Sequence, residues 1–249
     1  MDEKYCAFYG ESKSAEEALG RLIGILSILR KECPWDKVQT HESLRICMLE
    51  EAYELCDAID RKDTDNMEEE LGDVLLQVLF HSAIAGETSN FSLISVINRE
   101  CDKLIRRHPH VFSKENAKSV DNAIEKWENV KWKEKGDVSY GERLSSVPRA
   151  MPALIRSYKV QNKAAEAGYD RDDMSGAFRK LKEEAENLAA ICGDNDNAKI
   201  YEGLGNLLFA AVGVSRLINV NPEQALNAAS DRFIGRFARI EAEDLLKKG

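Results

Sequence analysis

Apolar residues recur at helical spacing along most of the chain, whereas strand-like alternation is scarce and only five prolines interrupt the pattern. Asn221 and Pro222 are typical of a helix start, where they would form the cap and the first turn. The pattern therefore predicts an all-α fold. The expected helices span about residues 15–32, 41–62, 66–86, 91–106, 119–135, 150–166, 173–192, 197–219 and 222–246.

The segment KEKGDVSYGERLSSVPRAMP, residues 133–152, collects Gly, Ser and Pro, and it indicates a boundary between two helical units. A chain of 249 residues is long enough to form two small cores. We therefore expect four parts along the chain: an N-terminal extension (1–14), a first unit (15–135), a linker (136–149) and a second unit (150–249).

The two units resemble each other in sequence. A shift of 133 residues places LEEAYEL, residues 49–55, on KEEAENL, and EELGDVLL, residues 69–76, on EGLGNLLF, without a gap. Two copies with a long period predict an internal duplication rather than a solenoid. The apolar framework survives in the second copy, but Glu54 becomes Asn187, Glu70 becomes Gly203 and Asp73 becomes Asn206.

Five acidic residues of the first copy are predicted to share one gap between two helices. At about 100° per residue, Glu50, Glu51 and Glu54 fit on one side of their helix, and Glu70 and Asp73 share a face of the next. An acidic helix face is ordinarily solvent-exposed surface. Here apolar residues surround the acids on both helices, which indicates at least partial burial. A short turn would make the two helices antiparallel neighbours.

Buried carboxylates must be neutralised by cations or protons. The set offers only oxygen ligands, which suits Mg²⁺, with Mn²⁺ as a substitute. A di-iron bundle would need Glu-x-x-His on its helices, and neither acidic segment contains it. Magnesium held by a few carboxylates keeps positions open for substrate phosphates, so a phosphate substrate is expected. No Walker A motif is present, which excludes a P-loop enzyme.

Composition and charge narrow the class of protein further. A net charge of −9 argues against sequence-independent electrostatic binding to nucleic acid. The start of the sequence has no signal-peptide pattern, and no apolar run reaches the roughly 18–20 residues of a membrane helix. The six cysteines form no CxxC pair, and we expect them to be free thiols because a reducing compartment disfavours disulfides. We expect a cytoplasmic protein that binds neither nucleic acid nor membrane.

Four segments together resemble MazG-type nucleoside triphosphate pyrophosphohydrolases over nearly the whole chain. They are the EExxE and ExxD acids, CPWDKVQTHESL (33–44), RRHPHVF (106–112) and VPRAMPALIRSYKVQNKAAEAGYD (147–170). The resemblance implies two tandem helical-bundle units of the MazG type and a Mg²⁺ site on two antiparallel helices. It also implies hydrolysis of nucleoside triphosphates between the α- and β-phosphates, a homodimer, and a role in removing noncanonical nucleotides or controlling nucleotide pools.

In that context Glu50, Glu51, Glu54, Glu70 and Asp73 are the expected metal ligands and catalytic acids. Either Glu54 or Glu51 would take the proton from the attacking water. Polyphosphate needs positive charge nearby, for which Arg107 and Lys131, with Lys103 and Arg106, are candidates. An exposed basic face is the alternative for these side chains. Trp35 is a candidate for base stacking, although tryptophan more often belongs to a core.

The second copy lacks the acids for the same metal site, so we expect it to be weakly active or inactive and to serve packing, dimerisation or regulation. Two alternatives to the enzyme assignment stay open. One is a regulatory or scaffold protein that binds nucleotide and metal without turnover. The other is a pyrimidine-dNTP-specific pyrophosphatase of the same all-α superfamily. The base preference and the physiological substrate are not encoded in any pattern that we can interpret.

Overall fold

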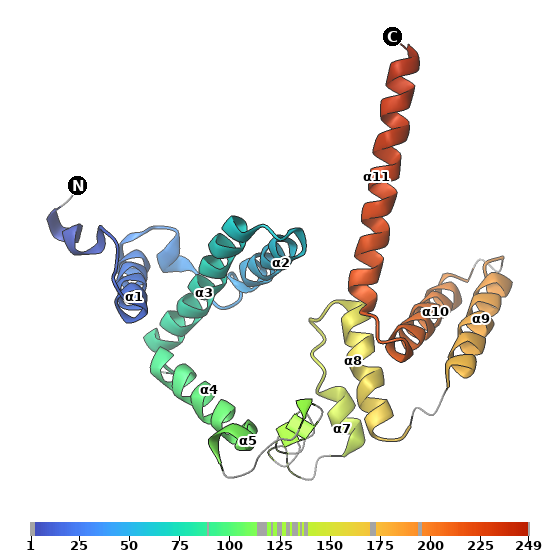
Figure 1. Cartoon of the computed structure of the whole chain (residues 1–249), viewed down its shortest axis with the longest axis horizontal. Coiled ribbons are helices and arrows are strands. Elements are labelled where there is room, and N and C mark those ends of the chain that lie inside the picture. The colour runs from blue at the N-terminus through green and yellow to red at the C-terminus, as the bar shows by residue number, and fades with distance from the viewer. Residues whose placement is uncertain are drawn as a thin grey trace. The chain divides into compact units, whose positions relative to one another are not determined.

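The protein is all-α, as the sequence predicted, and the described residues contain no strand (Figure 1). The computed structural model describes residues 3–88, 90–113, 119–120, 122–123, 126–127, 130, 134, 136, 139–169, 173–193 and 196–248, without the side chains of 242 and 244–248. The helix predicted at 119–135 lies partly outside this range. Within it, Trp127 and Glu134 are among the residues that are helical.

The described helices follow the predicted ranges closely, with ends that differ by a few residues. They are η1 (Glu3–Phe8), α1 (Ala15–Glu32), η2 (Asp36–Val38), α2 (Arg45–Arg61), α3 (Thr64–Glu87), α4 (Leu93–Arg107), α5 (Pro109–Phe112), α7 (Tyr140–Ser145), α8 (Ala153–Glu166), α9 (Met174–Ile191), α10 (Asn197–Leu217) and α11 (Pro222–Lys248).

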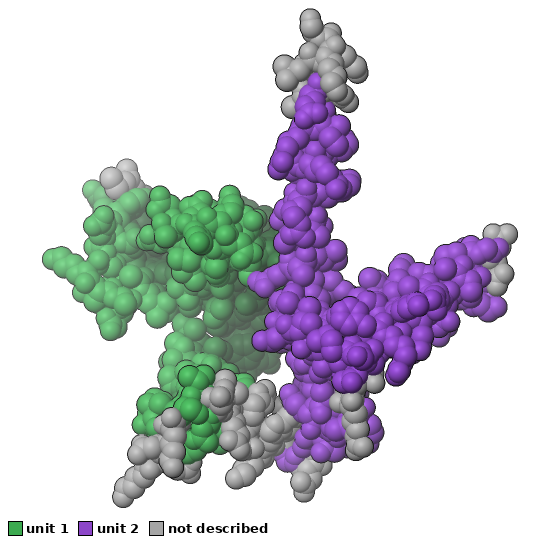
Figure 2. Space-filling model, turned by 45° about the vertical axis from the view of Figure 1, so that its right-hand side comes forward, with its two compact units in different colours: residues 1–134 green, residues 135–249 purple. Residues whose placement is uncertain are grey.

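The chain forms two compact units, residues 1–134 and 135–249 (Figure 2). The short helix α7, which begins with a capping box between Ser139 and Glu142, lies within the segment expected to be a linker and packs against α8. Asn221 caps α11 as predicted, since its Oδ1 accepts hydrogen bonds from the backbone N–H groups of Glu223 and Gln224.

The core of the first unit lies between α1, the segment before α2 and the second half of α3. Its buried members are Leu26, Leu44, Leu79, Phe80 and Ile84. Arg30 joins the same elements. Its guanidinium donates to the backbone oxygen of Gln39 at 3.1 Å and pairs with Glu87 of α3 at 2.6 Å. This side chain holds the loop after α1 against the end of α3.

Helices α2 and α3 form an antiparallel hairpin with a two-residue connection. Lys62 takes a left-handed conformation, with a φ of 57°, and ends α2. Asp63 then caps α3 by accepting from the Asn66 N–H at 3.2 Å. This turn is what sets α2 and α3 side by side, so it positions the acidic residues on each helix.

In the second unit α9 and α10 form the corresponding pair, and α8 packs against α10. Helix α10 begins at Asn197, which is 133 residues after the first residue of α3. Its cap is Asp196, the counterpart of Asp63, and the Asp196 carboxylate accepts from two backbone N–H groups. This match of helix starts and caps supports the predicted duplication.

No single helix among the described residues has the length and apolar composition needed to cross a membrane. One broken pair, α10 with residues 222–241 of α11, meets both criteria only when its two parts are taken together, and the pair is bent by 106°.

Candidate active site

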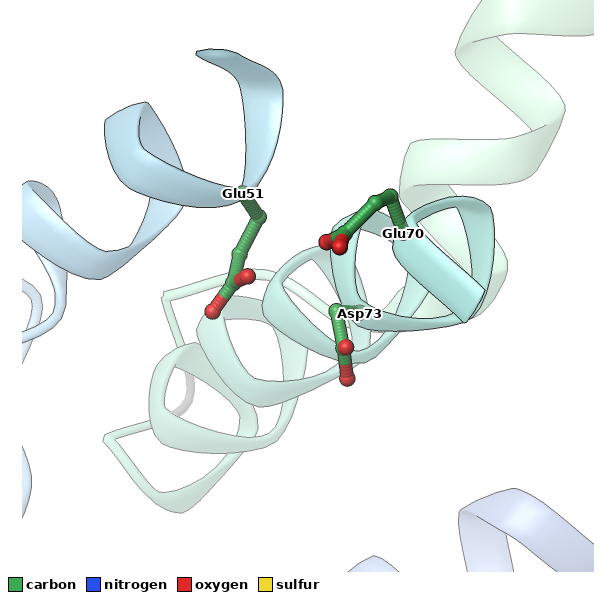
Figure 3. A group of neighbouring side chains, drawn as sticks. All are labelled: Glu51, Glu70 and Asp73. Carbon is green, nitrogen blue, oxygen red and sulfur yellow. The ribbon is translucent and has the colours of Figure 1, made fainter. Parts of the chain in front are cut away.

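Three of the five predicted acids meet between α2 and α3. Glu51 extends from α2, and Glu70 and Asp73 extend from α3, with the Glu70 carboxylate turned toward Glu51 (Figure 3). One oxygen atom from each of the three lies within 4.8 Å of the others. Glu70 is only 8% exposed, and Glu51 and Asp73 are half-buried. The expectation of partly buried acids is thus confirmed at this place.

Burial and mutual repulsion disfavour the charged forms of these acids. Burial raises the pKa of Glu51, and the negative charges of Asp73 and Glu54 raise it further. Burial likewise raises the pKa of Glu70, with Glu54, Asp73 and Glu51 adding to the effect. Within the described part of the chain no lysine or arginine forms an ion pair with Glu51, Glu70 or Asp73. The cluster therefore has an excess of negative charge that a cation would relieve.

Glu50 and Glu54 complete the predicted set from the exposed side of α2. Glu54 is close enough to raise the pKa of both Glu51 and Glu70, whereas Glu50 raises the pKa of Glu51 only weakly. Oxygen ligands from one buried and two half-buried carboxylates fit a hard divalent ion such as Mg²⁺ or Mn²⁺. The donor set contains no sulfur and no imidazole, which is the chemistry expected for such an ion.

Among the described residues, no ion pair joins Lys103, Arg106 or Arg107 to the acids of the cluster. Helix α4 leaves the end of α3 and leads away from the α2–α3 pair (Figure 1). At its end, Arg106 and Arg107 pair with Glu134 at 3.0 and 2.7 Å, and Arg107 also lies over the ring of Trp127. Lys103 pairs with Glu100 on the same helix.

Trp35 precedes η2 and is 58% exposed, so it is not a core residue. Its backbone oxygen accepts from the Gln39 side chain, which orders the loop. Lys131 lies outside the described residues. The role of these side chains in substrate binding stays a prediction.

Comparison with known proteins identifies the family. Residues 39–112 match the MazG nucleotide pyrophosphohydrolase domain. A Thermotoga maritima protein named nucleoside triphosphate pyrophosphohydrolase/pyrophosphatase MazG is 41% identical over 238 residues, which cover 95% of this chain and 89% of the relative. The chain belongs to the MazG family.

A second curated relative agrees with this membership. The Escherichia coli K12 protein named nucleoside triphosphate pyrophosphohydrolase is 37% identical over 228 residues, covering 90% of this chain and 87% of that protein. A crystal structure of a mazG-related protein from Thermotoga maritima shares 30% identity and covers 45% of this chain and 98% of that one, with a TM-score of 0.41.

The MazG domain match spans α2, α3, α4 and α5 and ends before the second unit. In the second unit, Glu184 stands where Glu51 stands in the first, and it is buried, whereas Glu51 is half-buried. The Lys180 ammonium lies 2.7 Å from it and lowers the pKa of this carboxyl. The second unit thus neutralises this buried acid with its own lysine.

Two features of the first unit were missed in the sequence. Gln77, one turn after Asp73 on α3, is buried beside the acids. Its signal is a lone polar residue in the apolar run LLQVLF at helical spacing from Asp73. The second feature is a stacked pair of histidines, His41 and His81, whose Nδ1 atoms are 2.8 Å apart. Their approach joins residues 40 positions apart, which no local pattern predicts.

Proposed function

We propose that this MazG chain hydrolyses nucleoside triphosphates to nucleoside monophosphate and pyrophosphate with the help of Mg²⁺ or Mn²⁺. The observation that carries the proposal is the Glu51, Glu70 and Asp73 cluster, with its oxygen atoms within 4.8 Å and its excess negative charge. The cluster lies within the segment that matches the MazG domain. Relatives over most of the chain are named for this activity.

The proposed chemistry divides the acids into two roles. Glu51, Glu70 and Asp73 would hold the metal, which would screen the negative charge of the substrate phosphates. Glu54 is exposed and stands outside the cluster, so its carboxylate is available to take a proton. A water oxygen attacks the α-phosphorus, the bond to the bridging oxygen breaks, and pyrophosphate leaves with the electron pair. Glu50 would add negative charge that favours metal binding.

We also propose that the active form is a homodimer. Six large apolar side chains on α2 and α3 are each at least 41% exposed in the single chain: Ile46, Leu49, Tyr53, Ile59, Leu71 and Leu75. An apolar surface of this extent beside a polar site is typical of an interface. A second copy could also supply basic groups that a single chain does not bring to its own acids. Arg106, Arg107, Lys103, Lys131 and Trp35 remain the candidates for contact with phosphate and base.

Product analysis tests the proposal. The purified chain would be incubated with a panel of NTPs, dNTPs and noncanonical nucleotides, with and without Mg²⁺, and the products separated by ion-exchange chromatography. We expect monophosphate and pyrophosphate in equal amounts, and only with the metal. Nucleoside diphosphate with phosphate, or nucleotide binding without any turnover, would overturn it. The nucleotide hydrolysed fastest would also decide between a broad enzyme and one specific for pyrimidine deoxynucleotides.

A further inference from the structure

Gln77 is the buried polar side chain nearest to the acid cluster on α3. It follows Asp73 by four residues and Glu70 by seven, so the three share one face of the helix. Its side chain contacts the Glu51 carboxylate across the gap to α2, and this contact favours the ionised form of Glu51. A carboxylate only accepts hydrogen bonds, so the amide nitrogen of Gln77 must face it.

The carbonyl oxygen of Gln77 is the second polar group of this side chain. Gln77 is only 6% exposed, and its Oε1 has no hydrogen-bond partner within the described part of the chain. A buried acceptor without a donor costs about 1–3 kcal/mol. An apolar side chain of similar size would avoid this cost, since the neighbouring residues of α3 are leucine, valine and phenylalanine. Retention of an unsatisfied amide therefore needs a reason other than packing.

The second unit supplies an internal comparison. The counterpart of Gln77 after the shift of 133 residues is Ala210. A cleft of about 480 Å³ in the second unit is lined by Glu184, Asn206 and Ala210. These residues are the counterparts of Glu51, Asp73 and Gln77. The second unit thus has neither the glutamine amide nor three of the five acids. The apolar residues of the helix pair are kept. Gln77 therefore resembles the acids, which are present only in the first helix pair, and not the apolar residues that both pairs share.

We propose that Gln77 is a positioning residue of the acid cluster: its amide nitrogen fixes the Glu51 carboxylate for a divalent ion, and its buried carbonyl oxygen accepts a hydrogen bond from a water molecule that this ion carries. The inference deepens the proposed function and rests on it. Groups that orient metal ligands in this way change metal affinity or activity by about 10- to 100-fold when removed.

The test measures metal binding and folding separately in metal-free protein. Mn²⁺ binding to the full chain would be followed through the electron paramagnetic resonance signal of the free ion, and the thermal midpoint would be recorded without metal. For Gln77→Leu we expect the Mn²⁺ dissociation constant to rise about 10-fold or more. The midpoint should stay equal or increase, because the unsatisfied acceptor is gone. Gln77→Ala, which matches the second unit, should weaken Mn²⁺ binding equally.

Gln161→Leu is the matched control. Gln161 is also a buried glutamine, but its amide nitrogen donates to the Phe209 backbone oxygen at 2.8 Å. This variant should lower the thermal midpoint and leave Mn²⁺ affinity unchanged. The proposal is overturned if Gln77→Leu binds Mn²⁺ as well as the wild type does, or if its midpoint falls as far as that of Gln161→Leu.

Failure of this inference and failure of the proposed function give different results. If the wild type forms monophosphate and pyrophosphate while Gln77→Leu keeps its Mn²⁺ affinity, only the role of Gln77 is wrong. If the wild type releases no pyrophosphate, yet Gln77→Leu weakens Mn²⁺ binding, the role in metal binding stands and the enzymatic proposal falls.

Discussion

Glu51 and Glu184 occupy equivalent positions in two helix pairs, yet their surroundings have opposite charge. Glu51 faces Asp73, Glu54 and Glu70, and burial with repulsion raises its pKa. Glu184 is paired with Lys180 one turn earlier on the same helix, and its pKa is lowered. A cation from solution would relieve the repulsion in the first pair, whereas Lys180 neutralises the acid of the second pair. The same framework therefore supports two electrostatic states.

Packing between the helices also differs. Glu70 projects into the gap of the first pair, but its counterpart Gly203 is buried against α9. A Cβ atom at Gly203 would lie 2.9 Å from the Ile191 side chain and 3.3 Å from that of Leu188. The space that holds a carboxylate in one unit is filled by apolar side chains in the other. At this one position α9 and α10 pack closely against each other.

The largest effect is expected for Glu70→Gln. Removal of a buried metal ligand should lower the turnover of nucleoside triphosphate at least about 100-fold. The metal-free variant should nevertheless be more stable than the wild type, because one charge of a repulsive buried cluster is gone. Steady-state pyrophosphate release and thermal denaturation measure the two effects. A variant that is both inactive and less stable would indicate that Glu70 serves folding instead.

Gly203→Glu tests whether the second unit can be given back its missing acid. The side chain would displace Leu188 and Ile191 and bury an unpaired charge, so we expect a loss of about 2 kcal/mol in the free energy of unfolding. Gly205→Glu is the control, since no described atom lies within 4 Å of a Cβ built there. Equal stability of the two variants in chemical denaturation would argue against closer packing of this pair.

Cys47→Lys transfers the built-in cation to the first unit, because Cys47 stands where Lys180 stands. The new ammonium would lie one turn from Glu51 and compete with the metal. Mn²⁺ affinity should fall about tenfold, which is about 1.4 kcal/mol. Cys56→Lys, at an exposed position of the same helix, is the control for a general effect of positive charge. If both variants weaken Mn²⁺ binding alike, the pairing argument fails.

The smallest effect concerns pH. Glu51 and Glu70 have folded pKa values above the unfolded value of 4.5, so their contribution to stability falls as the pH rises through the folded values. The metal-free wild type should therefore gain more stability between pH 7 and pH 5 than a Glu51→Gln/Glu70→Gln variant does. Burial and His41 lower the pKa of His81, so the contribution of His81 to stability falls as the pH falls. This opposite effect is the same in the wild type and in the variant.

Thermal midpoints at the two pH values measure that difference. Glu184 should not contribute to this difference in stability. Its pKa is lowered, so the stability that it contributes is lost only at pH values below about 4.5. Saturating Mg²⁺ should remove the extra gain of the wild type, since the metal neutralises the cluster. An identical response of both proteins without metal would contradict the repulsive cluster.

Local patterns predicted most of the helices and brought Glu51, Glu70 and Asp73 together, because helical spacing and a short turn fix which side chains share a gap. They failed where contacts join distant residues. The pairing of Arg106 and Arg107 with Glu134 spans 27 or 28 positions and depends on how the chain folds back. The start of this helix was also predicted too late, since α3 begins at Thr64 after its cap Asp63, whereas the expected range began at residue 66.

Burial of α2 was only partly predictable. Apolar residues all around this helix indicated a buried element, yet Ile46, Tyr53 and Ile59 are about half exposed in the single chain. The hydrophobic periodicity of α2 predicts that its apolar faces are buried. It does not specify whether the residues that bury them belong to the same chain or to a second copy. The proposed homodimer would resolve this difference by burying these residues against a second copy.

The central claim is that the first helix pair carries the chemistry and the second does not. It is tested most directly by pyrophosphate release from full-length Glu51→Gln and Glu184→Gln, measured side by side with saturating nucleoside triphosphate and Mg²⁺. We predict a loss of at least about 100-fold for Glu51→Gln and wild-type turnover for Glu184→Gln. Full activity of Glu51→Gln together with an inactive Glu184→Gln would contradict the claim.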